Sequence, residues 1–325
     1  MKRLAITGSS GYLGRKFVEH LRRVRSDVEI LGLDICPPGP APGSPHRFTR
    51  MDILSPDLGG TLSEFRPDSV IHAAFVVAPI RDRRKMRRVN VEGSRNLLDA
   101  AGRCGAERLM LVSSATAYGA WPDNPVPIEE GWPLRPAKFQ YAAEKVEVEA
   151  IAGEFAERHP EITVSCVRPA IIGGPRMNNY IYRFIFQLPV LALLDGCDTP
   201  VQFVHEEDCA AAMLAILTAG ARGAFNIGPT DWSSISEIAV ETRRWTVRLP
   251  FWLARKVHGL AWSIRLPVTE APVEFLDFAR YPWVVAPRRL GQELGYQFQY
   301  TSRETLLEIV HSRQSPEEGR LTPAR

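Results

Sequence analysis

Residues 3–14 read RLAITGSSGYLG, a short apolar run that leads directly into a glycine-rich loop. We expect a strand at Arg3–Thr7 and an amphipathic helix over Tyr12–Arg25 behind the loop. Glycines let the backbone turn tightly and approach a pyrophosphate, while the helix N-terminus offers unpaired N–H groups. The GxxGxxG spacing is one residue wider than the usual dinucleotide fingerprint, so a glycine-rich turn without a ligand is the alternative. The residues expected to contact the cofactor here are Gly8, Gly11, Tyr12, Leu13 and Gly14.

Short apolar runs alternate with helix-patterned stretches up to about Arg168, which predicts βαβ units and a parallel sheet. The expected strands are Arg3–Thr7, Val28–Leu33, Arg47–Thr49, Ser69–Ala73, Arg108–Ser113 and Thr163–Arg168. The expected helices are Tyr12–Arg25, Leu62–Phe65, Arg87–Gly102 and Tyr141–His159. The fold class is therefore α/β, a doubly wound Rossmann sheet.

The composition of the sequence changes after Arg168, where proline and aromatic residues become frequent. We expect a Rossmann domain over 1–169, to which 199–230 returns, and a smaller substrate-side lobe from 170–198 and 231–311. The polar tail 312–325 is expected to be disordered. The two lobes are thus interleaved in the sequence.

The composition excludes several classes of function. The 325 residues are 45% hydrophobic and 24% charged, and the net charge of +3 is too balanced to indicate a nucleic-acid partner. Five scattered cysteines with no zinc-type spacing predict a reducing cytoplasm and no metal site. Neither a signal peptide nor a membrane-spanning segment is predicted. A small-molecule substrate is the first expectation.

Asp34 ends the second predicted strand, 20 residues past Gly14. A carboxylate at that point accepts hydrogen bonds from the adenosine ribose hydroxyls and repels a 2′-phosphate. The next residue is Ile35, which is also expected to contact the cofactor, and no arginine follows directly. NAD is therefore predicted in preference to NADP, with a surface acid as the alternative for Asp34.

Further motifs follow the later strands in order. They are Asp52-Ile53, His72-Ala73-Ala74, Asn90-Val91-Glu92-Gly93, Ser113 to Gly119, Tyr141-Ala142-Ala143-Glu144-Lys145 and Arg168-Pro169. In this order and spacing they resemble the extended short-chain dehydrogenase/reductases, the NAD-dependent epimerase/dehydratase family. The resemblance covers about residues 1–230, with a fainter echo at 288–296.

The resemblance implies a catalytic set of Ser114, Tyr141 and Lys145. Tyr141 and Lys145 are four residues apart, so they share one helix face, and the ammonium is expected to lower the pKa of the phenol. Tyr141 would act as acid and base, Ser114 would orient the substrate oxygen, and Lys145 would also hold the nicotinamide ribose.

The resemblance also implies further cofactor contacts. Asp52 and Ile53 would reach the adenine, and Ala73, Ala74 and Phe75 would line the cofactor cleft. Asn90 and Ser113 would help to position the cofactor, and Pro169, Ala170 and Ile171 would reach the nicotinamide. His72 is expected to be structural, and the basic run Arg81–Arg88 to be a solvated face.

The substrate is less well specified. Nucleotide-sugar enzymes of this family often carry an arginine just before the Phe-Val-His segment, where this chain has Val201-Gln202. The stretch after Arg168 also lacks the asparagine common in sugar-nucleotide epimerases. Abundant aromatic residues after 245 suit an apolar pocket, although core packing explains each of them equally well. The segment 249–264 could lie on a membrane surface, but a helix packed on the core is the preferred interpretation.

Three functions remain open from the sequence. The first is an NAD-dependent oxidoreductase acting on a secondary alcohol or ketone of a partly apolar substrate. The second is a nucleotide-sugar epimerase or dehydratase with tightly held NAD, and the third is an NAD-sensing binding protein without turnover. The resemblance further implies a homodimer, paired through the helices expected at 87–102 and 141–159.

Overall fold

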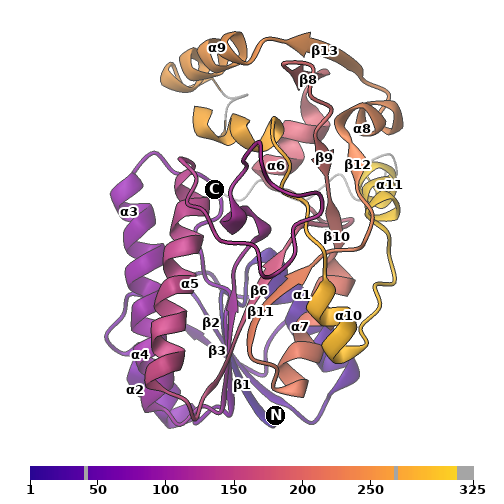
Figure 1. Ribbon diagram of the computed structural model, residues 1–325. Helices are drawn as coiled ribbons and strands as arrows, with labels where there is room; N and C mark the ends of the chain where they lie inside the picture. Colours follow the sequence, from indigo (N-terminus) through magenta and orange to yellow (C-terminus); the bar gives the residue numbers. More distant parts are fainter. Residues whose placement is uncertain (40–42, 267–269, 313–325) are drawn as a thin grey trace.

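A central sheet of seven parallel strands organises the molecule (Figure 1). This computed structural model describes residues 1–39, 43–266 and 270–312. The strand order is β11-β6-β5-β4-β1-β2-β3. The strands are β1 Arg3–Thr7, β2 Glu29–Asp34, β3 Arg47–Arg50, β4 Ser69–His72, β5 Arg108–Val112, β6 Thr163–Pro169 and β11 Gly223–Ile227. The α/β Rossmann class is confirmed, and β11 adds a strand, paired with β6, to the six that were predicted.

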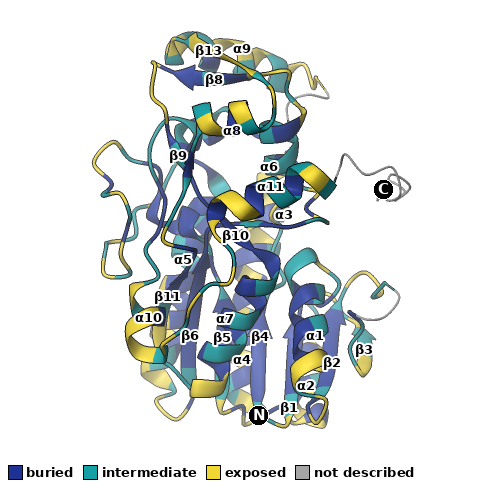
Figure 2. Cartoon of the chain, turned by 90° about the vertical axis from the view of Figure 1, so that its right-hand side faces the viewer, coloured by how far each residue is buried: buried dark blue, intermediate teal, exposed yellow. Residues whose placement is uncertain are grey.

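Helices cover both faces of the sheet. On one face α1 Tyr12–Val24 contacts α7 Glu206–Ala219, and on the other α4 Gly93–Arg103 contacts both α2 Leu58–Phe65 and α5 Gln140–Arg158. Figure 2 shows the central strands as buried between these layers. Each layer has its own apolar core, represented by Phe17 and Leu21 on the first face and by Leu97 and Phe155 on the second.

Two predicted helices differ from the observed ones at their N-termini. The helix expected at Leu62 begins at Leu58, because burial of Leu58 and Leu62 outweighs the poor helix propensity of Gly59 and Gly60. The helix expected at Arg87 begins earlier, as α3 Arg83–Arg87, because the Asp82 side chain caps it by accepting from the Lys85 N–H at 2.9 Å.

The predicted helix 87–102 is also interrupted. A π-helical turn, η1 Arg88–Glu92, separates α3 from α4. A side chain at Gly93 would collide with Ile53, since an added Cβ would lie 2.5 Å from its Cγ2. The turn therefore packs closely against the loop after β3, and π turns of this kind are frequent at functional sites.

Smaller elements lie beyond the carboxyl ends of the central strands (Figure 1). Three two-stranded sheets pair β7 Ile171–Gly173 with β10 Phe203–His205, β9 Pro200–Val201 with β12 Ser233–Ser234, and β8 Val190–Leu194 with β13 Trp245–Leu249. The accompanying helices are η2 Ala115–Tyr118, α6 Tyr180–Tyr182, η3 Arg183–Gln187, α8 Ile235–Glu241, α9 Phe251–Ser263, η4 Val273–Ala279 and α11 Ser302–Ser312. Another helix, α10 Arg288–Leu294, packs beside the sheet against β11 and α7. The tail predicted to be disordered starts at Ser312, which ends α11, and its remaining residues lie outside the described ranges.

Candidate active site

The glycine loop leaves no room for side chains at two of its positions. Gly8 has a φ of +71°, and an added Cβ would lie 2.6 Å from the backbone of Ala73 and Ala74. At Gly14 an added Cβ would lie 2.1 Å from the Gly8 carbonyl oxygen. Gly11 precedes α1 and supplies no side-chain cap, so the first N–H groups of this helix can bind a pyrophosphate.

Asp34 stands beside this loop at the carboxyl end of β2. Its carboxylate accepts from the Ser10 N–H and from the Cys36 N–H, each at 3.0 Å. These bonds hold a half-buried acid next to the loop, at the place where the ribose of a dinucleotide is expected. The glycine loop, the N-terminus of α1 and the Asp34 carboxylate together fit NAD. Ile35, beside Asp34, is exposed.

Ser114 and Tyr141 come together from different elements. Ser114 caps η2, and its Oγ accepts from the Thr116 N–H at 3.2 Å, which fixes the hydroxyl after β5. Tyr141 lies in the first turn of α5 with 8% of its surface exposed. Burial raises the pKa of Tyr141 to about 12, although a side-chain hydrogen bond with Ser114 opposes the rise.

Lys145 lies one turn further along α5. Its Nζ donates to the Val112 carbonyl at 2.7 Å and lies 3.5 Å from the ring centroid of Phe75. Burial lowers the pKa of Lys145 to about 7, against the opposing charge of Glu149. We expected this ammonium to lower the pKa of Tyr141, but the phenol pKa moves upward, because burial dominates and Nζ is 5.6 Å from the ring centroid of Tyr141.

A buried ion pair supports this part of α5. Glu149 accepts from Arg168 at 2.6 Å and also from the Ser113 hydroxyl. Arg168 in turn donates to the Tyr118 hydroxyl at 2.7 Å. The Ser113 side chain, predicted to position the cofactor, is thus bonded within the protein. We missed Glu149, although its place four residues after Lys145 put it on the same helix face.

Asn90 lies within the π turn and is fully buried. Its Oδ1 accepts from the Val76 N–H at 2.7 Å, and its Nδ2 donates to Glu144 at 2.8 Å. Asn90 therefore joins α5 to the segment that follows Ala73, Ala74 and Phe75. We predicted that Asn90 helps to position the cofactor, and it could do so by holding the segment that would line the cofactor cleft. Glu144, which accepts from Asn90, was not predicted to take part in the site.

His72 is structural, as predicted. Its ring nitrogens contact the Thr7 hydroxyl at 2.9 Å and the Ser94 hydroxyl at 2.8 Å. Burial lowers the pKa of His72 to about 3, so the imidazole is neutral at physiological pH. Both nitrogens are occupied by these hydroxyls, and the residue is not available as a base.

The remaining predicted cofactor residues occupy the expected edge of the sheet. Asp52 accepts from the Leu54 N–H at 2.9 Å in the turn after β3, and Ile53 is buried. Pro169 ends β6, the Ala170 N–H donates to Ile227 at 2.9 Å, and Ile171 begins β7. Adenine contacts for Asp52 and Ile53 and nicotinamide contacts for Pro169, Ala170 and Ile171 stay predictions.

Gln202 occupies the place at which nucleotide-sugar enzymes often have a charged pair. Its Nε2 donates to Pro229 at 2.6 Å and to Val285 at 2.9 Å, and its Oε1 accepts from the Val285 N–H at 2.9 Å. The side chain is buried and fully used in joining three segments of backbone. It has no capacity left to bind a phosphate.

A pocket of about 260 Å³ opens beside Tyr141. Its apolar wall contains Ile80, Met86, Phe139, Trp262, Pro272 and Val273, and its charged residues are Arg81, Arg83, Lys138 and Glu274. Arg81, Arg83 and Met86 of the basic run 81–88 thus line the pocket. We predicted a solvated face for that run, and all of its basic side chains are exposed, while Met86 is buried.

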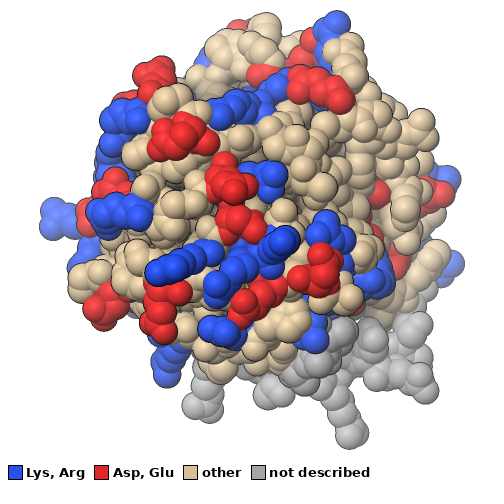
Figure 3. Space-filling view, turned by 90° about the horizontal axis from the view of Figure 1, so that it is seen from below, with Lys and Arg blue, Asp and Glu red and all other residues tan. Residues whose placement is uncertain are grey.

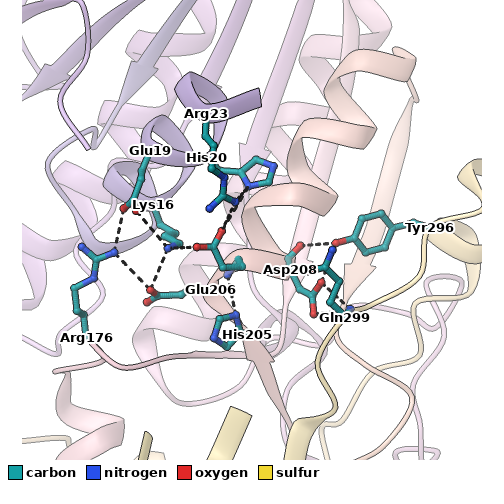
Figure 4. A network of polar contacts seen from close by, with 11 residues as sticks. Lys16, Glu19, His20, Arg23, Arg176, His205, Glu206, Asp208, Tyr296 and Gln299 are labelled. Carbon is teal, nitrogen blue, oxygen red and sulfur yellow. Dashed lines mark hydrogen bonds and ion pairs between the residues drawn. The ribbon is translucent and has the colours of Figure 1, made fainter. Parts of the chain in front are cut away.

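Figure 4 shows a separate polar network where α1 meets α7. The Tyr12 hydroxyl donates to buried Glu206, and burial together with that carboxylate raises the pKa of Tyr12. Lys16 pairs with Glu206 at 3.4 Å, and Arg176 pairs with the same carboxylate at 3.7 Å. The Tyr12 hydroxyl is thus bonded to α7. The predicted contact between Tyr12 and the cofactor stays a prediction, and its backbone N–H in the first turn of α1 is the group that could make it.

Neither a group of three or more potential metal ligands nor a helix long and apolar enough to cross a membrane occurs in residues 1–39, 43–266 and 270–312.

The family model for the NAD dependent epimerase/dehydratase family matches residues 4–228. The chain belongs to this family and is an NAD-dependent enzyme of the short-chain dehydrogenase/reductase type. NAD, the cofactor predicted from the glycine loop and Asp34, is confirmed by this family match.

Individual relatives are more distant. The chain is 29% identical over 257 residues to UDP-glucose 4-epimerase of Mycolicibacterium smegmatis, which spans 73% of this chain and 80% of the relative. It is 25% identical over 319 residues to an uncharacterized protein of Mycobacterium tuberculosis, across 96% of this chain and 84% of that protein. Among solved structures, UDP-glucose 4-epimerase of Thermus thermophilus in complex with NAD superposes with a TM-score of 0.75 at 23% identity, covering 97% of this chain and 99% of that one.

Proposed function

We propose that the chain transfers a hydride between NAD and the carbon of a secondary alcohol or ketone, with Ser114, Tyr141 and Lys145 as the catalytic residues. Bound NAD would supply the hydride acceptor and donor. Tyr141 exchanges the proton of the substrate oxygen, and Ser114 orients that oxygen by hydrogen bonding. Lys145, one turn further along α5, would hold the nicotinamide ribose through its Nζ and, when protonated, would supply positive charge near the phenol.

The observation that carries this proposal is the Ser114–Tyr141 hydrogen bond at the side of a partly apolar pocket. With a pKa of about 12, Tyr141 is protonated at neutral pH and is set to donate to a ketone oxygen. In the direction of oxidation the phenol must lose its proton, which a nearby positive charge favours. The lining of the pocket suits a substrate with an apolar part and an anionic group.

The proposal is tested with purified protein, NAD and a panel of secondary alcohols, followed by the absorbance of NADH. Stoichiometric accumulation of NADH with an alcohol that carries an apolar group is the expected result. An absence of NADH with every alcohol, combined with chemical change of a nucleotide sugar, would overturn net oxidation.

Nucleotide-sugar epimerisation or dehydration is the second candidate, and the identities of relatives favour it. The curated relatives include UDP-glucose 4-epimerases and a dTDP-glucose 4,6-dehydratase. Against it stands Gln202, whose polar atoms are all engaged by backbone. Incubation with UDP-glucose followed by chromatography decides the matter, because an epimerase forms the isomer without net NADH.

A third candidate, a sensor that binds NAD without turnover, has less support. Sensing gives no reason to bury a tyrosine against Ser114 or to place a lysine beneath it. Turnover of any substrate in either assay would exclude it.

We also propose a homodimer that forms through α4 and α5. The outward side of α5 carries Ala143, Val146, Ala150 and Gly153, small residues that allow close helix packing. The cysteines of the described residues, Cys36, Cys104, Cys166, Cys197 and Cys209, are free, which supports a reducing, cytoplasmic location. We expect a small-molecule substrate as the partner of the site, and we do not expect a nucleic-acid partner.

A further inference from the structure

Six of the thirteen large apolar side chains that are exposed in the described residues come from β13, from α9 and from Ile264, which directly follows α9. β13 and α9 lie at the end of the molecule opposite the N-terminus (Figure 1). The residues that define this surface, here called the α9 surface, are Trp245, Val247, Trp252, Val257, Leu260 and Ile264. Trp245 is 81% exposed, Leu260 64% and Trp252 61%. Such a patch normally marks an interaction site.

The apolar residues of α9 share one side of the helix. Trp252, Leu260 and Ile264 follow one another at multiples of four residues, the spacing of a helical stripe. The inner side of α9 contributes Ala254, which packs with Leu194 and Leu276. The sequence allowed either a membrane surface or core packing for this segment, and the structure shows a helix that packs on its inner side and leaves its outer side uncovered.

The charge of this segment is entirely basic. Between Thr242 and Leu266 the sequence contains no aspartate or glutamate, while it contains five arginines and Lys256. Arg248, Lys256 and Arg265 are exposed, and none of them pairs with a carboxylate of the described residues. Lys256 extends over the Trp252 ring, with its Nζ 5.3 Å from the ring centroid. Apolar and cationic side chains are therefore intermixed on the α9 surface.

The opposite end of the molecule differs from the α9 surface in its distribution of charge. Figure 3, which views that end, shows Lys and Arg interspersed with Asp and Glu. An alternating surface of that kind has no preference for one sign of charge. The uncompensated basic charge is thus a property of the α9 surface, where the exposed aromatic residues also lie.

We propose that the α9 surface docks on an anionic lipid bilayer. Amphipathic helices with Trp and Leu on one side and Lys and Arg beside them lie in the headgroup region, where apolar burial and attraction to anionic lipid add together. A second copy of the chain is a poorer occupant, because two α9 surfaces would oppose like charges with no acid between them. Attachment is peripheral and reversible, and it leaves the Rossmann side in water.

Docking would bring the pocket close to the lipid. Trp262, in the last turn of α9, lines the pocket beside Tyr141. Arg81, which lines the same pocket, stacks on Trp262 with its guanidinium 4.2 Å from the ring centroid. The α9 surface and the pocket therefore share one helix.

The test is cosedimentation of the full chain with vesicles. We expect binding to vesicles of phosphatidylcholine mixed with phosphatidylglycerol, at least about tenfold stronger than to phosphatidylcholine alone, and weakened by salt. The variant W252S/L260S should lose at least about tenfold in binding, since both changes are at exposed positions. The matched control V24S/V126S, which replaces exposed apolar residues elsewhere, should bind like the parent chain.

A second variant separates charge from apolar contact. R248E/K256E should lose binding to the anionic vesicles and keep the circular dichroism spectrum of the parent. The proposal is overturned if the parent chain does not sediment with anionic vesicles, or if W252S/L260S binds equally well. It is also overturned if W252S/L260S changes the molecular mass by light scattering without affecting vesicles, because the α9 surface would then join two copies. NAD-dependent activity in detergent-free buffer is a separate readout, and it is expected to be unchanged in both variants.

Discussion

Tyr141 and Lys145 are both removed from water at the start of α5, and burial acts on them in opposite directions. It disfavours the phenolate of Tyr141 and the ammonium of Lys145, so both side chains are pushed towards their neutral forms. In this buried position, a change in local charge has a large effect on the pKa of each residue. This is the usual condition of acid and base groups in active sites.

Replacing Tyr141 by Phe removes the proton-exchanging hydroxyl and keeps the ring. Turnover should fall by about 10²- to 10⁴-fold, because general acid and base catalysis contributes that much. NAD affinity, measured by fluorescence titration, should change by less than about twofold. Tyr281→Phe is the matched control, since Tyr281 is absent from the pocket lining. Near-normal turnover in Tyr141→Phe would remove the assigned acid and base.

Lys145 predicts a pH-dependent stability. Its pKa is about 7 in the folded chain and 10.5 in the unfolded chain, so between these values the unfolded state holds the extra proton. The destabilising effect of Lys145 is complete below pH 7 and disappears as the pH rises to 10.5. Lys145→Met should therefore stabilise the fold more at pH 6 than at pH 9, by about 2 kcal/mol in urea unfolding. Exposed Lys138→Met should show no such dependence, and a flat difference for Lys145→Met would contradict the lowered pKa.

Asp34 is expected to select NAD. Asp34→Ala should weaken NAD about tenfold and NADP less, because a hydrogen bond to a charged group is worth about 1.5–3 kcal/mol. Calorimetric titration with each dinucleotide measures the two losses, and Asp99→Ala, on the exposed side of α4, is the control. Equal losses for both cofactors would show that the carboxylate does not read the ribose.

Residues of the site differed in how far the sequence revealed them. Ser114, Tyr141 and Lys145 were located by the family resemblance of their motifs, and Asp34 by its position at the end of the second predicted strand. Glu149 and Gln202 act through partners far away in the chain, such as Arg168 and Val285. Such contacts have no local signature. The pKa direction of Tyr141 was wrong for a related reason, because burial depends on the whole fold.

Secondary structure elements were predictable where apolar periodicity was strong. The six predicted strands were found to within a residue or two, because each is a short run that contains apolar residues and is bounded by loops. Boundaries failed at α2, where Gly59 and Gly60 concealed a packed helix start, and at the π turn before α4. Gly93, directly after the π turn, packs closely against Ile53, a contact between distant segments that periodicity cannot reveal.

The joint between the glycine loop and α1 can be tested at Gly14. Gly14→Ala should abolish measurable NAD binding and lower the free energy of unfolding by about 1–3 kcal/mol, because the new methyl group meets the Gly8 carbonyl. Gly60→Ala is a matched control, since no atom lies within 4 Å of its added Cβ. This control in α2 should gain up to about 1 kcal/mol. Normal NAD affinity in Gly14→Ala would contradict the tight loop.

At the scale of the molecule, alternation of strands and helices was sufficient for the Rossmann class. It did not reveal β11, because Gly223–Ile227 is a strand only in the company of β6. The small sheets β10-β7, β9-β12 and β8-β13 were equally hidden, since each contains strands of two to five residues from distant segments.

Dimerisation through α4 and α5 is open to a direct measurement. The parent chain should show twice its 36.3 kDa mass in light scattering. Ala150→Arg, which places a long cation on the outward side of α5, should yield the monomer. Ser63→Arg, an equal change on exposed α2, should leave the dimer intact. A monomeric parent chain would disprove the pairing.

The bonds of Gln202 have a consequence for recombination between relatives. One side chain ties the backbone at Pro229 and Val285 to the strand that precedes α7, so three separate passes of the chain meet at a single amide. A chimaera that exchanges only one of these segments would combine Gln202 from one parent with a backbone partner from the other, so the hydrogen bonds of the amide would be lost or misaligned. Substrate preference in this family should therefore be transplanted as a set of segments, and libraries built from a single crossover should be dominated by misfolded products.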